Sequence, residues 1–406
     1  MPLFRALLLS LILVTAARAA DWPQWLGPNR DGVSTEKVAP WKKAPERVWA
    51  MPVGDGHSSP IVADGKVFLH YGVKGKNAEE VAAFDAKTGK KLWSTQYERV
   101  AFESPFGYGP RGTPAHVDGK LYTLGVTGVL CCFDAKEGKI LWQIDTLKKY
   151  EAPNLTFGVS CSPLIDGDNV IVMVGKGATV VAFERTKGTE VWKSLEDPAS
   201  YSSPVLFGTG KDKQVVLLTQ QGVVGLDPAS GKEFWRYKLV DLLSESSTTP
   251  VKMDDVIFAS SVTFGGVGLK METKEGKPAT AEVWKSKPLT CYFSTPVVAD
   301  KHLYAVTGQI VPPQANLRCV DPKTGKVLWT QNKVGKYHAA LLRTGNDKLL
   351  MLDDGGGLAL LEPDAKGFKE VCRSKVSGPT WAHPALANGL LYLRDAKELI
   401  CLKMVE

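Results

Sequence analysis

Hydrophobic and polar residues alternate along this chain in short runs that recur at a fixed spacing. One unit contains four apolar or alternating runs, at Ser59 to Ala63, Lys66 to Tyr71, Glu80 to Phe84 and Lys91 to Ser94. Asp64-Gly65 separates the first two runs, and such dipeptides suit tight hairpins because glycine adopts a positive φ without steric cost. Each unit is therefore predicted to form four short antiparallel strands.

Each unit ends in a motif that contains an acidic residue, a glycine and a closing tryptophan. Examples are FDAKTGKKLW, ending at Trp93, and VDPKTGKVLW, ending at Trp329. From position 49 to position 372, seven intervals cover 323 residues, so the period is about 46 residues. We expect each indole to fill the space between adjacent units and to donate its N–H to a neighbouring backbone carbonyl. The closing positions are Trp49, Trp93, Trp142, Trp192, Trp235, Trp284 and Trp329, with Cys372 where an eighth tryptophan would fall.

Four strands per repeat is the pattern of one β-propeller blade, whose faces are buried only when neighbouring blades stack. The repeats begin with a lone closing strand, Arg47 to Pro52, and finish with opening strands between Pro384 and Leu402. Pairing these strands would complete one shared blade and remove the free sheet edges. We therefore predict an all-β, eight-bladed propeller of four-stranded antiparallel blades over residues 46–406. Seven blades is the alternative, because Ser261 to Ala281 lacks the acidic turn and Cys372 replaces a tryptophan.

The N-terminus has the pattern of a secretory signal peptide. Met1 to Arg5 carries a positive charge, Ala6 to Val14 is apolar, and Ala17-Arg18-Ala19 supplies the small residues of a cleavage site. We predict a signal peptide over residues 1–19, a lead-in segment over residues 20–45, and export to the periplasm or the extracellular space. No cysteine follows the apolar stretch, so a lipid anchor is not expected.

Composition narrows the class of protein. Hydrophobic residues make up 44% and charged residues 23% of the 406 residues, as in ordinary soluble globular proteins. The net charge of +7 is spread along the chain without basic runs, which gives no reason to expect nucleic-acid binding. After the N-terminus, no apolar run is long enough for a transmembrane helix. We expect a monomer.

The repeated core, Ala/Cys/Leu-x-Asp-x-x-x-Gly-Lys-x-x-Trp, resembles the repeat of the pyrroloquinoline quinone (PQQ)-like propellers. That superfamily includes quinoprotein alcohol dehydrogenases and an outer-membrane assembly lipoprotein. The opening DWPQWLGPNRDG, residues 21–32, also resembles the lead-in of many secreted bacterial members. The resemblance covers essentially the whole mature chain and implies the eight-bladed fold. It does not separate enzymes from non-catalytic scaffolds, since both use this repeat.

The adjacent pair Cys131-Cys132 bears on that choice, because the resembling dehydrogenases carry a vicinal disulfide against the quinone. Here the pair lies in a predicted third strand and leads directly into the turn Phe133-Asp134. Cys132 occupies the repeat position that Ala83 and Ala182 hold in sister blades, which favours burial as a small strand residue. A cofactor-stacking disulfide is the alternative interpretation.

The acidic residues and histidines do not form a recognisable metal motif. Turn formation accounts for the carboxylates Asp85, Asp134, Glu184, Asp227, Asp321 and Glu362. The loop acids that could ligate Ca²⁺ or act as a base have no ligand spacing, and we expect them to be solvated: Glu103, Asp145, Glu151 and Glu245. The six histidines show no HxH or HExxH spacing. We predict no metal site and assign no catalytic residue.

The residues that precede each innermost strand are the best candidates for a site, because they converge on one mouth of the central channel. Counting three residues back from each opening proline, and including two adjacent histidines, selects His57, Arg111, Tyr201, Phe293, Tyr337, His338, Trp381 and His383, together with Ser160 and Ser247. Aromatic and cationic groups there would suit a planar anionic ligand. The alternative is that these rings only plug the channel. The longest connections, Thr95 to Gly112 and Lys148 to Cys161, are candidate recognition loops.

The missing acid and metal cluster favours a secreted, non-catalytic module that binds a ligand or assembles with a protein partner. The alternative is a quinoprotein oxidoreductase of the alcohol or sugar dehydrogenase type, in which the resemblance implies PQQ and Ca²⁺ as cofactors. In either case, we expect the channel mouth to be the binding site.

Overall fold

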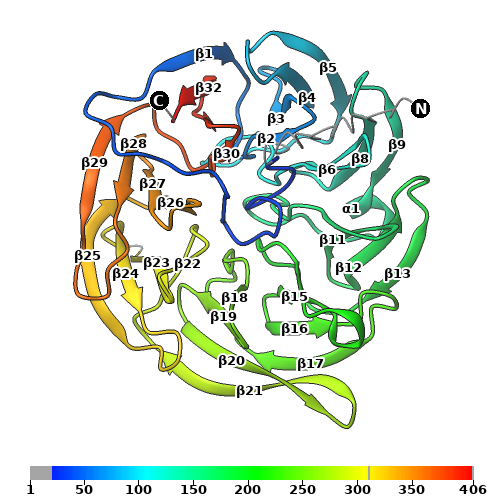
Figure 1. The fold of residues 1–406 in the computed structure, drawn as a ribbon. Coiled ribbons are helices and arrows are strands. Elements are labelled where there is room, and N and C mark those ends of the chain that lie inside the picture. The colour runs from blue at the N-terminus through cyan, green and yellow to red at the C-terminus, as the bar shows by residue number, and fades with distance from the viewer. Residues whose placement is uncertain (1–20, 310, 405–406) are drawn as a thin grey trace, which may run out of the picture.

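The computed structural model describes residues 21–309 and 311–404, which form a ring of eight four-stranded antiparallel sheets (Figure 1). The predicted signal peptide lies outside the described residues. In seven of the sheets the strands run in chain order from the central axis to the rim, and in the eighth the strand at the rim comes from the N-terminal part of the chain (Figure 1). Blade 1 comprises β2 (Ile61–Ala63), β3 (Lys66–Gly72), β4 (Ala78–Asp85) and β5 (Lys91–Glu98), and blade 2 comprises β6 (Ala115–Val117), β7 (Lys120–Leu124), β8 (Val129–Asp134) and β9 (Ile140–Asp145). Blade 3 comprises β10 (Leu164–Asp166), β11 (Asn169–Gly175), β12 (Ala178–Glu184) and β13 (Glu190–Ser194), and blade 4 comprises β14 (Val205–Phe207), β15 (Gln214–Leu218), β16 (Gly222–Leu226) and β17 (Glu233–Lys238).

Blades 5 to 8 complete the ring. Blade 5 comprises β18 (Val251–Met253), β19 (Val256–Ser261), β20 (Gly265–Lys274) and β21 (Lys277–Ser286), and blade 6 comprises β22 (Val297–Ala299), β23 (His302–Gln309), β24 (Gln314–Val320) and β25 (Val327–Gly335). Blade 7 comprises β26 (Ala339–Arg343), β27 (Leu349–Asp353), β28 (Gly357–Leu361) and β29 (Glu370–Lys375), and blade 8 comprises β30 (Ala385–Ala387), β31 (Leu390–Arg394), β32 (Glu398–Lys403) and β1 (Arg47–Pro52). Two short helices lie in connections, α1 (Thr146–Lys149) and the 3₁₀ helix η1 (Gly210–Asp212). No helix among the described residues is long and apolar enough to cross a membrane.

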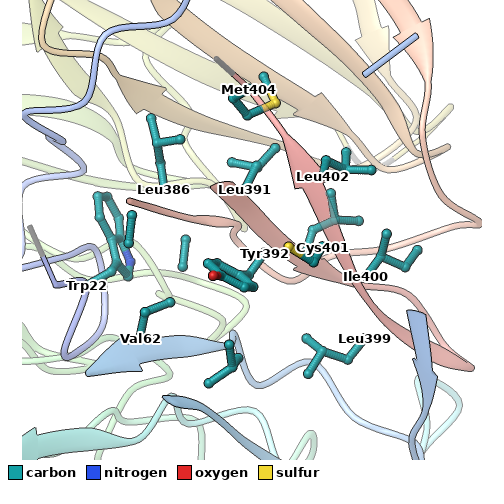
Figure 2. Packing of buried hydrophobic residues seen from close by; sticks show 14 of the residues in the cluster. Trp22, Val62, Leu386, Leu391, Tyr392, Leu399, Ile400, Cys401, Leu402 and Met404 are labelled. Carbon is teal, nitrogen blue, oxygen red and sulfur yellow. The ribbon is translucent and has the colours of Figure 1, made fainter. Parts of the chain in front are cut away.

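The shared blade closes the ring as the sequence predicts. Strand β1 pairs antiparallel with β32, so Trp49 lies opposite Cys401 and the sheet order is β1-β32-β31-β30. Figure 2 shows the buried cluster around this closure, where Trp22 of the lead-in lies beside Val62, and Tyr392 lies near Cys401. The prediction of eight blades is confirmed, and the alternative of seven is wrong.

Six of the seven closing tryptophans make the expected bond to the next blade. The indole N–H of Trp49 donates to the carbonyl of Ala86 at 3.0 Å, and the bonds of Trp93, Trp142, Trp192, Trp284 and Trp329 follow the same pattern. The Trp49 ring also lies against Gly89, where an added Cβ would come within 2.7 Å of the indole. The acidic turn therefore needs glycine both for its positive φ, 71°, and for this close contact.

Trp235 and Cys372 depart from the pattern, for different reasons. Blade 5 replaces the acidic turn with the long hairpin β20–β21, and the indole of Trp235 donates instead to the Gln214 side chain of its own blade, at 2.6 Å. The expected backbone bond is therefore wrong at Trp235. At Cys372 the missing indole is replaced by Trp41 of the lead-in, whose backbone N–H lies 3.5 Å from the Cys372 sulfur and whose indole donates to Ser374 at 3.1 Å.

The Ser/Thr-Pro pairs that open the inner strands link neighbouring blades around the channel. The backbone N–H of His383 donates to the Ser59 hydroxyl at 3.0 Å, and that of Ser59 donates to the Thr113 hydroxyl at 3.2 Å. The series continues from Thr113 to Ser162 and from Ser162 to Ser203, both at 2.9 Å. These bonds hold the residues that precede each inner strand at one end of the channel, which we call the mouth.

Candidate functional site

The lead-in closes the channel at the end opposite the mouth. Its backbone pairs with Val62 near the hairpin end of the inner strands, and its loop crosses the centre of the ring (Figure 1). The Trp25 indole donates to the Thr249 hydroxyl at 3.0 Å and lies edge-on to His383, with ring centroids 4.8 Å apart. Buried Arg30 donates to the carbonyl of Pro163 at 2.8 Å. The channel is therefore a cup with a floor.

The cup has a volume of about 140 Å³ and is lined by most of the residues that the sequence selects. Six of the eight candidates line it, as do Ser160 and Ser247: His57, Arg111, Tyr201, Phe293, Trp381 and His383. Tyr337 and His338 do not line it. Counting back from the opening prolines thus selects residues that the structure brings together around one cavity, apart from Tyr337 and the adjacent His338. Whether the cup binds a ligand stays a prediction.

Trp381 is the centre of an aromatic wall. Its ring lies between those of His57 and Phe293, with centroids 5.3 Å and 5.1 Å away and interplanar angles of 25° and 19°. Phe106 contacts it at 5.3 Å, and Tyr337 packs edge-on at 5.8 Å. Tyr337 therefore supports Trp381 from outside the cup. Stacking on several neighbours fixes the orientation of the Trp381 ring.

The histidines at the cup are uncharged at neutral pH. Burial lowers the pKa of His57 to about 4 and that of His338 to about 3, and it lowers the pKa of His383 as well. His338 is 1% exposed, its Nδ1 lies 2.8 Å from the Ser294 hydroxyl, and its ring packs edge-on against His383 at 5.3 Å. His338 thus supports His383 from behind, and neither ring supplies the positive charge expected at the mouth.

Arg111 is the one cationic side chain that lines the cup, and its donors are largely committed to the neighbouring loop. It donates to the carbonyls of Gly109 at 2.9 Å and Gly107 at 3.3 Å, while burial lowers its pKa to about 10. Asp55 holds the same loop from the other side, because its Oδ2 accepts the N–H groups of Tyr108 and Gly109 at 2.8 Å and 3.0 Å. The two charges therefore shape the loop that carries Phe106.

A buried polar cluster in blade 1 anchors this loop. Glu79, which is fully buried, accepts a hydrogen bond from the Tyr97 hydroxyl at 2.5 Å and lies 3.2 Å from His70 Nε2. The guanidinium of Arg99 lies 3.7 Å from Glu79 and donates to the carbonyl of Tyr108 at 3.0 Å. Arg99 thus links the buried carboxylate of Glu79 in blade 1 to the loop at the mouth that carries Phe106.

Eight residues that line the cup are not among those selected by counting back: Trp25, Phe106, Phe157, Ser162, Ser203, Glu245, Thr249 and Tyr292. Phe106 and Phe157 lie in the two long connections named as candidate recognition loops. Glu245, which we expected to be solvated, lies in the wall and accepts a hydrogen bond from the Tyr292 hydroxyl. Phe157, from the connection before β10, lies 5.7 Å from Tyr201. Glu245 precedes the selected Ser247 by two residues, so a wider window around each inner strand would have found it. Trp25 carries no repeat signal and could be placed only by the fold.

The residues of the cup do not fit PQQ and Ca²⁺. Glu245 is the one carboxylate among the lining residues, and no group of three or more His, Cys, Asp or Glu within the described ranges could hold a metal ion. Cys131 and Cys132 are free, buried in β8 and absent from the cup lining, which bears out the packing interpretation.

The eight-bladed ring with its closing tryptophans defines a PQQ-like propeller. A sequence family described as "Outer membrane protein assembly factor BamB" matches residues 37–103, 77–331 and 313–402, so the chain belongs to this family.

Curated relatives of two kinds are similar to the chain. The outer membrane protein assembly factor BamB of Shewanella oneidensis is 24% identical over 412 residues, covering 95% of this chain and 94% of that protein. The dehydrogenase subunit of a quinone alcohol dehydrogenase from Komagataeibacter europaeus is 29% identical over 160 residues, covering 36% of this chain and 20% of that protein.

Solved structures agree on the fold. BamB from Moraxella catarrhalis has a TM-score of 0.62 at 16% identity and covers 89% of this chain and 98% of that one. A europium-containing methanol dehydrogenase has a TM-score of 0.68 at 14% identity and covers 94% and 89%. At such identities the likeness shows the fold alone. The choice between an assembly factor and a dehydrogenase therefore rests on the chemistry of the site.

Proposed function

We propose that this protein is an exported, non-catalytic scaffold that binds a protein partner at its mouth, with the cup as the central contact. The observation that carries the proposal is the chemistry of the cup, which has an aromatic wall, uncharged histidines and a single carboxylate. Such a wall suits recognition of an apolar or amphipathic group. It lacks the donor set that a quinone and its metal ion would need.

The loops around the cup support a protein partner. Leu242 is 84% exposed, Leu243 is 46% exposed and Val240 is 42% exposed, all in the connection that leads from β17 to the cup residue Glu245. Phe106, on the opposite side of the cup, is 38% exposed. Apolar side chains that gather on one face of a soluble protein commonly mark an interaction surface.

The extent of similarity points the same way. The alignment with a named assembly factor runs along nearly the whole chain, whereas the alignment with the quinone dehydrogenase subunit covers about a third of it. The predicted signal peptide would place the scaffold outside the cytoplasm, where outer-membrane proteins are assembled. Both points support the proposal without defining the partner.

Site-specific photo-crosslinking in the native host tests the proposal. A crosslinker at exposed Leu242, on the mouth face, should yield a discrete adduct with an outer-membrane protein or a factor that assembles one, identified by mass spectrometry. The matched control position is exposed Lys323, in the turn between β24 and β25 on the opposite face. Trp381→Ala should abolish the Leu242 adduct, and a cooperative thermal unfolding transition should show that the variant still folds. Equal adducts from both positions, or an adduct that survives Trp381→Ala, would contradict the proposal.

A cofactor titration separates the scaffold from the enzyme. Purified protein mixed with PQQ and Ca²⁺ should show no stoichiometric spectral change and no dye-linked oxidation of alcohols or sugars. A stoichiometric spectral change accompanied by such oxidation would overturn the scaffold proposal.

A further inference from the structure

Glu245 is a carboxylate in an aromatic wall, and among the described residues it forms no ion pair with a basic side chain. Tyr292 donates its hydroxyl hydrogen to Glu245 Oε2. Every ion pair between side chains in the described ranges involves other carboxylates. The remaining hydrogen-bonding capacity of this carboxylate is therefore available to a ligand that enters the cup.

The rings near Glu245 add to this negative potential. Tyr292 stacks on Phe293 with centroids 3.7 Å apart, and Phe157 lies 5.7 Å from Tyr201. The faces of aromatic rings attract cations, and the attraction grows when the cation is removed from water. Several rings and one carboxylate around a small cavity form the arrangement that recognises ammonium groups.

The positive charge of Arg111 does not cancel this preference. Its guanidinium donates to the carbonyls of Gly109 and Gly107 in the loop that precedes it, and the negative charge of Asp55 works to raise the pKa of Arg111 against the effect of burial. The histidines contribute no charge at neutral pH. His383 is 4% exposed, and its Nε2 has no hydrogen-bond partner although the residue lines the cup.

The size of the cavity limits the ligand to one small group. A volume of about 140 Å³ corresponds to a benzene-sized occupant. Beside the cup lies a second depression of about 300 Å³, bounded by Pro153 to Phe157 and by Leu243 to Glu245, and it shares Tyr201 with the cup. This groove offers a path for whatever chain carries the bound group.

We propose that the cup binds a single alkylammonium group, either the ε-ammonium of a lysine or a small methylated amine. The aromatic side chains of the wall would contact the cation, and Glu245 would balance its charge. The lysine source rests on the proposed function, because a protein partner would supply the side chain. The methylated amine does not depend on that function.

A charge-matched ligand series tests the sign of the preference. Choline, its neutral isostere 3,3-dimethylbutan-1-ol and the anion 3,3-dimethylbutyrate are titrated into purified protein and followed by tryptophan fluorescence. Choline should bind roughly tenfold more tightly than the neutral isostere, and the anion should bind most weakly. The ratio of the affinities for choline and for the neutral isostere should stay constant from pH 6 to pH 8, because the histidines at the cup do not titrate in that range. Equal binding of choline and the alcohol, or tighter binding of the anion, would overturn the proposal.

Three variants locate the effect. Glu245→Gln should bring choline to within about twofold of the alcohol, whereas the control Glu275→Gln, at the exposed tip of the β20–β21 hairpin, should leave the ratio unchanged. Tyr292→Phe frees the carboxylate from its hydrogen bond and should preserve or increase the preference. Thermal melting checks folding, and a Tyr292→Phe protein that loses the preference would also contradict the assignment.

Peptides identify the source of the ammonium group. Acetyl-Gly-Lys-Gly-amide is compared with the same peptide carrying norleucine or trimethyllysine in place of lysine. Binding of the lysine peptide above that of norleucine supports a protein side chain, and binding of choline alone supports a small amine. If no cation binds while the Leu242 crosslink still depends on Trp381, the ammonium proposal fails and the scaffold proposal stands. If choline binds but no crosslink forms, the scaffold proposal fails and the ammonium proposal stands.

Discussion

Replacing Glu79 with glutamine removes a negative charge from inside blade 1, where the carboxylate is fully buried. In the native protein the carboxylate contacts the Tyr97 hydroxyl at 2.5 Å, the Val126 N–H at 3.0 Å and His70 at 3.2 Å, and Arg99 lies 3.7 Å away. Glutamine has nearly the same shape, but its one carbonyl oxygen can accept only one of the two hydrogen bonds that Tyr97 and Val126 donate to different oxygens of Glu79. The substitution therefore removes the negative charge and one acceptor.

The magnitude follows from the state of Arg99. Its Nε is buried and has no hydrogen-bond partner, so Glu79 is the charge that compensates it. Removing one partner of a buried ion pair usually costs about 3 to 5 kcal/mol, because the other charge stays buried and unpaired. A loss of that size is large against a total stability of roughly 5 to 15 kcal/mol. Glu79→Gln should therefore lower the free energy of unfolding by about 3 to 5 kcal/mol.

Urea unfolding at pH 7, followed by tryptophan fluorescence, measures this loss. The control is Glu98→Gln at the exposed end of β5, which should change stability by less than about 0.5 kcal/mol. Burial works to raise the pKa of Glu79, but the His70 charge and the hydrogen bonds from Tyr97 and Val126 hold that pKa below its ordinary value. A carboxyl with a lowered folded-state pKa contributes stability above its unfolded pKa, about 4.3, and loses it as the pH falls further.

The difference between wild type and Glu79→Gln should therefore shrink as the pH falls below about 4.3. A variant within 1 kcal/mol of wild type at pH 7 would refute the claim that Arg99 depends on Glu79. So would a stability difference that does not change with pH.

Three further predictions concern packing, thiols and pH. Trp192→Phe removes the 3.1 Å bond to the Pro228 carbonyl and should cost about 1 to 3 kcal/mol in urea unfolding; no loss would show that the bond between blades is dispensable. Denatured but unreduced protein should take up one alkylating group per cysteine, including Cys131 and Cys132, whereas a mass showing two blocked thiols would reveal a disulfide. Burial lowers the pKa of His338 to about 3, so the unfolded state binds more protons between about pH 3 and pH 6.5 and stability should fall as the pH drops through that window. His338→Asn should make that part of the pH profile less steep, while His57 and His383, whose pKa values burial also lowers, keep the rest of the slope. An unchanged profile would contradict the assignment.

The fold could be predicted in detail because the repeat records it many times. The acidic turn, its glycine and the closing tryptophan act together across each blade boundary, as the Trp49 contact with Gly89 shows. The departures occur where the repeat is locally lost. Nothing in the sequence near Trp235 indicates that Gln214 will accept its N–H, and nothing near Cys372 indicates that Trp41 will cover it.

The convergence of residues on the cup was predictable in part for the same reason. Counting back from each opening proline finds residues at the mouth because the inner strands all start at the same level around the axis. It fails for Tyr337, which supports Trp381 from outside the cup, and it cannot find Glu245, whose loop does not follow the repeat. The positive charge at the mouth is also smaller than predicted, because burial keeps the histidines uncharged.

Local pattern was thus enough to specify the four-stranded unit, the number of units and the closure of the ring, since each depends on contacts that recur at one spacing. The cup is different, because one residue from each of several blades meets Trp25 of the lead-in at the axis. Those residues are far apart in sequence, and their types differ from blade to blade. Only the closed ring decided that Glu245 and Trp381 would line one cavity, that the histidines beside them would be neutral, and that Cys131 and Cys132 would lie outside it.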